Sequence, residues 1–241
     1  MTRRNAGKRN TTNLMWRCHR KGNNSRNVGT IARGVAGMLA LATDEGFAIV
    51  PIGSSPKCGR DFADYCGQVL LETEVRLRPS IDTYLCSPGE IAFHTDHPEA
   101  DAVVWHCHIQ DEEDGATLLI DGLAAYRALS ATDQRELRRL CLDCPTISET
   151  RPSHGHPFVD GDAIFFAPWL VPGQLDVRLQ SALVGFQNLL SAKSPWCREV
   201  RLAPGEALMI DNRRFLHGRR SIPPDSQRWL TRYWIGHRRS A

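Results

Sequence analysis

The sequence lacks any long run of apolar residues. Its hydrophobic stretches are short and are interrupted by charged residues or glycine, whereas a membrane-spanning helix needs about 20 consecutive apolar residues. The start of the chain also lacks the apolar stretch and the small-residue cleavage site of a secretory signal. We therefore expect no membrane segment and a cytoplasmic protein.

Acidic residues are absent from the first 26 positions, which carry eight lysines and arginines. We interpret residues 1–28 as a basic, mostly disordered arm, and a solvated tail is favoured over a surface for nucleic acids or anions. Since the whole chain has a formal charge of +3, removing those eight charges leaves about −5 on the remainder. No nucleic-acid partner is expected for the folded part.

Internal repeats, low-complexity segments and internal linkers are also missing. A chain of 241 residues with 41% hydrophobic residues is long enough to bury a substantial core. We predict one domain over residues 29–241. Cys141 and Cys144 form a C-x-x-C, but no second pair follows at the spacing of a zinc ribbon, so packing near a helix end explains them best.

Short apolar or alternating runs dominate the rest of the sequence. They predict strands at 47–52, 73–80, 83–87, 90–96, 101–109, 116–122, 163–170, 197–203, 206–212 and 228–237. Helical periodicity predicts helices over 30–46, 61–72, 123–143 and 176–192, with a cap or break at 130–133. Many short strands with a few segregated helices predict an α+β fold built around a β-barrel or jelly roll. Trp169 is expected to pack in the core.

His94 and Asp96 lie two residues apart at the end of an apolar run, in "FHTD". A solvated strand end is the ordinary explanation, and half of a metal site is the alternative. His217 follows a further strand-like run and is flanked by turn residues. Two histidines and one carboxylate match the facial triad of non-haem iron(II) oxygenases, which leaves positions open for a chelating co-substrate and for dioxygen. Zinc would favour a closed or nearly closed tetrahedron.

Two arginines, Arg228 and Arg232, lie in "RWLTRYW", shortly after His217. The alternation of a strand places them with Leu230 on one face. Guanidinium groups on the inward face of an apolar strand are costly unless each meets an anion. A dicarboxylate co-substrate would supply one, because the planar guanidinium binds a carboxylate with two hydrogen bonds.

Four segments together resemble the taurine dioxygenase and clavaminate synthase-like family of iron(II)/2-oxoglutarate oxygenases. They are "FHTD" (93–96), "DGATLLIDGLAAYRALS" (114–130), "APGEALMIDNRRFLHGRRS" (203–221) and "RWLTRYW" (228–234). The resemblance covers the chain from about residue 46 to its end. It implies a double-stranded β-helix, the jelly-roll barrel of this family, with flanking helices and with iron near one mouth.

The resemblance also assigns roles to single residues. It implies that His94, Asp96 and His217 are the iron ligands. Thr117 and Arg228 match the residues that hold the distal carboxylate of 2-oxoglutarate, and Arg232 matches an arginine that holds the acidic group of the substrate. Because Asp96 is present, halogenation is not expected, whereas desaturation and cyclisation stay open beside hydroxylation.

The expected activity is therefore hydroxylation of an unactivated C–H bond in a small carboxylate- or sulfonate-bearing molecule, a free amino acid or a derivative, with succinate and carbon dioxide as co-products. Two alternatives stay open: a cupin-like iron enzyme that does not use 2-oxoglutarate, and a non-catalytic jelly-roll binding module. His106 and His108 share a strand face and are interpreted as half-buried strand residues. Lining the pocket or forming a second metal site are their alternatives. The sequence makes no prediction of the oligomeric state.

Overall fold

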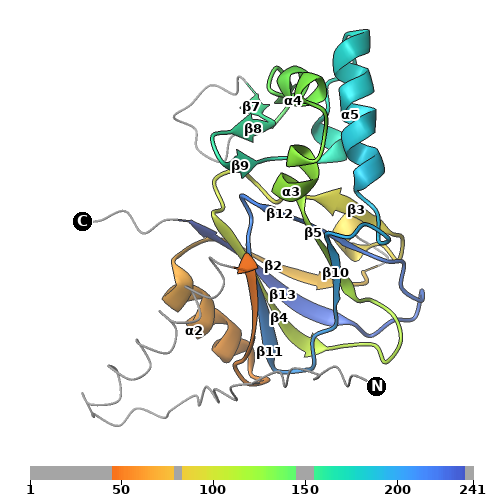
Figure 1. Cartoon of the computed structure of the whole chain (residues 1–241). Helices are drawn as coiled ribbons and strands as arrows, with labels where there is room; N and C mark the ends of the chain where they lie inside the picture. The colour runs from red at the N-terminus through yellow and green to blue at the C-terminus, as the bar shows by residue number, and fades with distance from the viewer. Residues whose placement is uncertain (1–44, 79–82, 145–154, 237–241) are drawn as a thin grey trace, which may run out of the picture.

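The computed structural model describes residues 45–78, 83–144 and 155–236 (Figure 1). The expected basic arm at 1–28 lies outside these ranges, and so does nearly all of the helix expected at 30–46. Within them, the elements are antiparallel sheets with a few helices, so the prediction of an α+β fold is confirmed. None of the described helices is long and apolar enough to cross a membrane.

Two antiparallel sheets form the body of the fold. The larger has the order β1 (Phe47–Pro51), β11 (Glu206–Asp211), β4 (Ala102–Ile109), β13 (Trp229–Gly236) and β2 (Gln68–Arg76). The smaller has the order β10 (Cys197–Val200), β5 (Thr117–Asp121), β12 (Phe215–Arg219) and β3 (Ile91–His94). Two short ribbons pair β6 (Cys141–Leu142) with β7 (His156–Pro157) and β8 (Val159–Asp160) with β9 (Ala163–Ile164).

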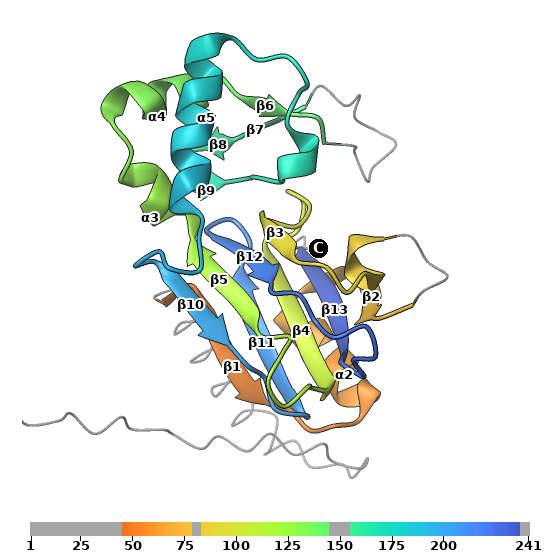
Figure 2. The same ribbon diagram turned by 90° about the vertical axis from the view of Figure 1, so that its right-hand side faces the viewer.

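The two large sheets face each other across a common hydrophobic cluster (Figures 1 and 2). Val103 and Trp105 of β4, Ile210 of β11 and Leu230 of β13 meet Leu119 of β5 in this cluster. Each strand contributes the side chains of one face, as the two-residue period of a strand requires. The functional side chains described below lie at the edge of this cluster.

One helix packs on the larger sheet, and three helices gather at one end of the smaller sheet. α2 (Pro56–Cys66) packs on the larger sheet through Phe62 and Ala63, which share a cluster with Val104 and Tyr233. α3 (Gly122–Arg127), α4 (Ala131–Leu137) and α5 (Val177–Leu189) gather at the other end of the molecule (Figure 2). They share a second cluster with apolar residues of β3, β5 and β12. Short 3₁₀ turns lie at Tyr84–Cys86 and Pro168–Leu170.

One helix boundary differs from the prediction and one predicted break is confirmed. The helix expected at 61–72 lies at Pro56–Cys66, and β2 begins at Gln68. Gly67 separates them, where an added Cβ would lie 2.5 Å from Ile235 Cγ2. The expected break at 130–133 is confirmed: the Ser130 hydroxyl accepts a hydrogen bond from the Asp133 amide and begins α4.

The strand expected at 83–87 is a 3₁₀ turn, and that expected at 163–170 is the short β9 followed by a second 3₁₀ turn. The prediction that Trp169 packs in the core is wrong, because the residue is 50% exposed. The turn that begins at Pro168 directs its ring toward the rings of Tyr84 and His94 instead.

Candidate metal centre

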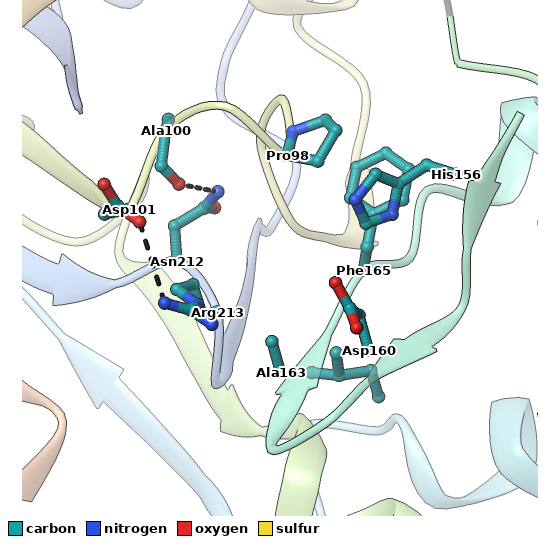
Figure 3. Close-up of a pocket in the computed structure, with 10 residues that line it drawn as sticks. Pro98, Ala100, Asp101, His156, Asp160, Ala163, Phe165, Asn212 and Arg213 are labelled. Atoms are coloured by element: carbon teal, nitrogen blue, oxygen red, sulfur yellow. Dashed lines mark hydrogen bonds and ion pairs between the residues drawn. The ribbon is translucent and has the colours of Figure 1, made fainter. Parts of the chain in front are cut away.

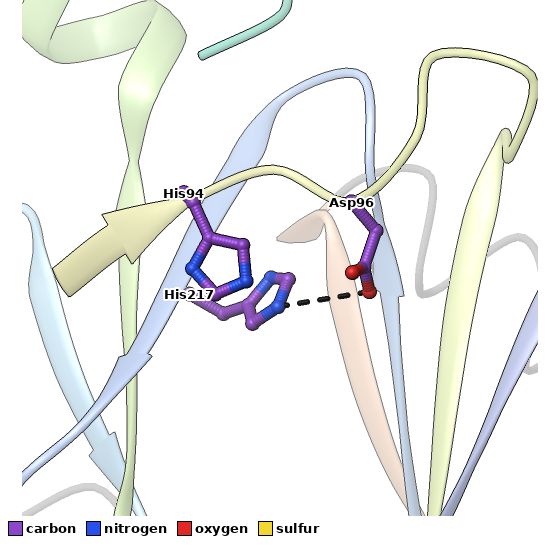
Figure 4. Close-up of side chains that lie close together, drawn as sticks. All are labelled: His94, Asp96 and His217. Carbon is purple, nitrogen blue, oxygen red and sulfur yellow. Dashed lines mark ion pairs between the residues drawn. The ribbon is translucent and has the colours of Figure 1, made fainter. Parts of the chain in front are cut away.

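His94, Asp96 and His217 come together at one end of the smaller sheet (Figure 4). His94 is the last residue of β3, and it is paired directly with His217 in the centre of β12. The two imidazole centroids are therefore only 4.2 Å apart. Asp96 follows β3 by two residues, and the three potential ligand atoms all lie within 4.8 Å of one another. All three side chains are buried.

The His94 ring is held in one orientation. Its Nδ1 donates a hydrogen bond to the Ala92 carbonyl at 2.8 Å, since a carbonyl can only accept. Nε2 is then the unprotonated nitrogen, and it is buried without a hydrogen-bond partner. A carbonyl that accepts from one ring nitrogen in this way sets the tautomer in which the other nitrogen can bind a metal.

Both imidazoles favour their neutral forms. Burial lowers the pKa of His94. Burial, the neighbouring His94 and the Arg232 guanidinium place the pKa of His217 well below its ordinary value. Metal binding requires unprotonated imidazole, so the pair is in the protonation state that a metal ion needs at neutral pH.

Asp96 has two differently placed carboxylate oxygens. Oδ1 accepts a hydrogen bond from Arg232 Nη1 at 2.5 Å. Oδ2 lies 3.7 Å from His217 Nε2 (Figure 4) and has no hydrogen-bond partner. A buried carboxylate oxygen and a buried imidazole nitrogen without partners are costly. Together with neutral imidazoles they fit a divalent cation.

The backbone that carries Asp96 is fixed by Asn212, which follows β11. The Asn212 Oδ1 accepts from the Asp96 amide at 2.8 Å, and Nδ2 donates to the Ala100 carbonyl at 2.8 Å (Figure 3). The adjacent Thr95 exchanges hydrogen bonds with the backbone of Phe166. Asn212 was not predicted. The only signal was an "IDN" at the end of a strand, which is common in ordinary turns.

A hollow of about 120 Å³ lies beside this loop, between Asp101, His156, Asp160 and Arg213 (Figure 3). Asp101 and Arg213 face each other there at 3.9 Å. The hollow is separate from the three clustered side chains, none of which lines it. We assign it no role.

A cavity adjoins the histidine pair between the two sheets. It is lined by His94 and His217 and, further in, by Trp105, Thr117, Arg219, Arg228, Leu230 and Arg232. The structure thus brings the predicted residues Thr117 and Arg228 to the same cavity as the two histidines. β5 places Thr117 there, because its Cα is paired with that of Arg219 on β12.

Arg228 lies in this cavity without an ion pair among the described residues, although the Asp111 carboxylate favours its charge. Its residue is 4% exposed, and Nε has no hydrogen-bond partner. Burial, followed by the positive charge of Arg219, lowers its pKa to about 10. Gly115 makes room for the side chain, since an added Cβ would lie 2.6 Å from Arg228 Cδ. A buried guanidinium in this state fits an anionic ligand.

Arg219 is a second cationic residue of the cavity, and it was not predicted. It is 4% exposed, and its Nη2 donates to the carbonyls of Ser87 and Gly89 at 2.6 and 2.7 Å. Burial lowers its pKa. The signal available in the sequence was its position two residues after His217, where alternation places both on one strand face.

Arg232 lies on the predicted face of β13, since Arg228, Leu230 and Arg232 all line the cavity. Its guanidinium is also engaged within the protein, however. It pairs with Asp96 and lies 5.2 Å from the Trp234 ring centroid. The structure therefore connects the residue predicted to hold the substrate with a predicted metal ligand.

His106 and His108 project from β4 toward the opposite side, where His106 lies against Gly59 of α2. His106 is fully buried and its Nε2 is 2.8 Å from the Gly53 carbonyl. His108 is partly buried and its Nε2 is 2.8 Å from Thr231 Oγ1. Neither lines the cavities around the clustered side chains. The interpretation as strand residues is favoured over that of pocket residues.

The sequence pattern of the family described as "Taurine catabolism dioxygenase TauD, TfdA family" matches residues 52–234. The chain belongs to this family. The resemblance predicted from four sequence segments is thereby confirmed, and with it the expected class, a non-haem iron(II)- and 2-oxoglutarate-dependent dioxygenase. No curated protein sequence matches the chain.

Solved structures of oxygenases resemble this TauD-family chain in fold. Asparagine oxygenase in complex with Fe(II), 2S,3S-3-hydroxyasparagine and succinate is 18% identical, with a TM-score of 0.68 over 86% of this chain and 79% of that one. The non-heme iron oxygenase OrfP with Fe, succinate and (3S)-hydroxy-L-Arg is 19% identical, with a TM-score of 0.65 over 87% and 83%. OrfP with Fe and alpha-ketoglutaric acid is 20% identical, with a TM-score of 0.64 over 88% and 83%. At these identities the similarity is one of fold.

Proposed function

We propose that this TauD-family protein hydroxylates an unactivated C–H bond of a small carboxylate- or sulfonate-bearing molecule, a free amino acid or a derivative, with iron(II), 2-oxoglutarate and dioxygen. Succinate and carbon dioxide are the co-products. One arrangement carries the proposal: the buried cluster of His94, Asp96 and His217 beside a cavity lined by Arg228, whose buried Nε has no hydrogen-bond partner.

The metal ligands in this proposal are Nε2 of His94, a ring nitrogen of His217 and Oδ2 of Asp96. Their support is that His94 Nε2 and Asp96 Oδ2 are buried without hydrogen-bond partners, in a set that matches the facial triad. Bound iron supplies the activation of dioxygen. The chain favours the neutral form of both imidazoles by burial, and it pairs the Asp96 carboxylate with Arg232.

The charges around the cavity support a dianionic co-substrate. Three buried guanidiniums, Arg219, Arg228 and Arg232, line it, and Asp96 is the one carboxylate paired with any of them in the part of the chain that the structure describes. Buried charges persist when they are paired. In this proposal, the Thr117 hydroxyl and Arg228 hold the distal carboxylate of 2-oxoglutarate. The other end then points toward the histidines.

Arg232 serves two purposes in the proposal. Its Nη1 orients Asp96, and its Nε, which is buried without a partner, is a donor for the acidic group of the substrate. The presence of Asp96 argues for hydroxylation over halogenation, because the carboxylate occupies the position that a halide would take.

We also propose the finer description of the fold, a double-stranded β-helix within one domain over residues 29–241. The two facing sheets and their shared hydrophobic cluster support it. This architecture is one of the ways in which antiparallel strands bury one face and protect their edges.

Anaerobic titration of the iron(II)-loaded protein with 2-oxoglutarate tests the function. A charge-transfer absorption band that appears with the wild type and is lost with His217→Ala is the expected result, followed by succinate formation once air and substrate are added. A metal-dependent activity that never requires 2-oxoglutarate would favour the cupin-like alternative. Absence of metal binding would favour the non-catalytic module.

A further inference from the structure

A second hollow adjoins the metal ligands on the side away from Arg228. Its volume is about 150 Å³, and His94 and Asp96 form its floor. Its walls are mainly apolar or aromatic, with Tyr84, Phe165, Ala167, Trp169, Leu170 and Trp234, and the polar residues Thr95, His97 and Cys144 also line it. His94 lines both this hollow and the cavity that contains Arg228. A metal held by His94 would therefore lie between the co-substrate and the group that fills this hollow.

Two large rings at this site remain half exposed. Trp169 is 50% exposed and Tyr84 is 40% exposed, and their centroids are 5.0 Å apart. Each ring also contacts His94, at 4.8 Å from Trp169 and 5.6 Å from Tyr84. Aromatic faces left open beside a reactive centre are a binding surface for another apolar or aromatic group, which they would remove from water.

The site offers little to a charged or amide side chain. Among the described residues that line it, Asp96 is the only carboxylate, and its Oδ1 is already paired with Arg232. The Thr95 hydroxyl is bonded to the Phe166 backbone. The Trp234 ring already has the Arg232 guanidinium over it, and its buried Nε1 is a donor without a hydrogen-bond partner. A guanidinium or amide group would exchange most of its hydration here for a mainly apolar wall.

The geometry points to a substrate whose reacting portion is a neutral hydrophobic group of about the size of one ring: an amino acid of the phenylalanine or leucine type, with its side chain against Trp169 and Tyr84. This inference rests on the proposed function. A dry cavity of about 150 Å³ is known to take up benzene, so the volume suits one such group. It separates this chain from the structurally similar oxygenases whose complexes contain hydroxylated asparagine and arginine.

Substrate binding to the anaerobic iron(II)–2-oxoglutarate protein tests the inference. Phenylalanine, leucine, asparagine and arginine are titrated separately, and the change in the charge-transfer band gives each Kd. Succinate formation in air gives the matching activities. We expect phenylalanine or leucine to bind more tightly than asparagine and arginine by about tenfold or more, the size of effect that hydrophobic pocket contacts produce.

Three variants link the preference to the rings. Trp169→Ala is expected to raise the Kd of the preferred amino acid about tenfold or more, while the 2-oxoglutarate titration stays unchanged. Trp169→Phe should restore most of the affinity for the amino acid. Val184→Ala, at an exposed position on α5, is the control and should change neither titration.

The outcomes separate the two proposals. No charge-transfer band with 2-oxoglutarate would overturn the proposed function and this inference with it. A normal band combined with equal or tighter binding of asparagine or arginine would overturn this inference alone. An unchanged hydrophobic preference in Trp169→Ala would do so as well.

Discussion

Replacing Arg228 by methionine is expected to weaken the binding of 2-oxoglutarate and, at the same time, to stabilise the metal-free protein against unfolding. The side chain is buried, and burial is the main reason why its pKa falls below its ordinary value, to about 10. A tenfold change in a protonation equilibrium corresponds to about 1.4 kcal/mol. Keeping this guanidinium charged without an anion therefore costs the fold on the order of 3 kcal/mol. Methionine fills similar space without the charge.

The two effects are measured separately. Loss of a charge-assisted contact in a buried site costs about 2–5 kcal/mol, so the Kd for 2-oxoglutarate in the anaerobic titration should rise about thirtyfold or more. Thermal unfolding of the metal-free variant should shift upward, by about 2–4 °C for each kcal/mol gained in a chain of this size.

Arg178→Met is the matched control, because Arg178 is exposed at the start of α5, and it should change neither quantity. A core residue that only supports packing would lower the Tm when it is replaced. An Arg228→Met variant that melts lower than the wild type, or that binds 2-oxoglutarate with unchanged affinity, would refute the reasoning from an uncompensated buried charge.

Three further outcomes are expected. His217→Ala should lose iron(II) binding in a direct metal titration while its far-UV circular dichroism stays native-like; tight stoichiometric binding would contradict the ligand assignment. Gly115→Ala should weaken the binding of 2-oxoglutarate and leave the affinity for iron unchanged, because residue 115 has a φ of +73° and the new Cβ would lie 2.6 Å from Arg228 Cδ. An unchanged affinity for 2-oxoglutarate would show that Arg228 is not held by this contact. Burial lowers the pKa of His108 to about 4, so its contribution to stability is present above about pH 6.5 and is lost as the pH falls toward 4. Urea unfolding should therefore show that the free energy of unfolding falls less between pH 7.5 and pH 4.5 in His108→Gln than in the wild type. Equal decreases in the two proteins would contradict a contribution from His108.

Local patterns in the sequence were sufficient for much of the site. The two-residue spacing of His94 and Asp96 and the alternation of Arg228, Leu230 and Arg232 depend only on the period of a strand. That period is a property of the backbone, so it placed these side chains on common faces before any packing was known. The helix break at Ser130 was also predictable from local sequence, since a cap involves residues only three positions apart.

Contacts between distant segments were decided only by the tertiary structure. The pairing of Arg232 with Asp96 joins β13 to the end of β3, and Asn212 fixes the Asp96 backbone from the far end of β11. No local period encodes either contact. Trp169 shows the limit most clearly: its apolar neighbours predicted a core position, yet the 3₁₀ turn directs its ring toward His94. Whether an aromatic side chain fills a core or borders a binding site depends on which surfaces the fold brings opposite to it.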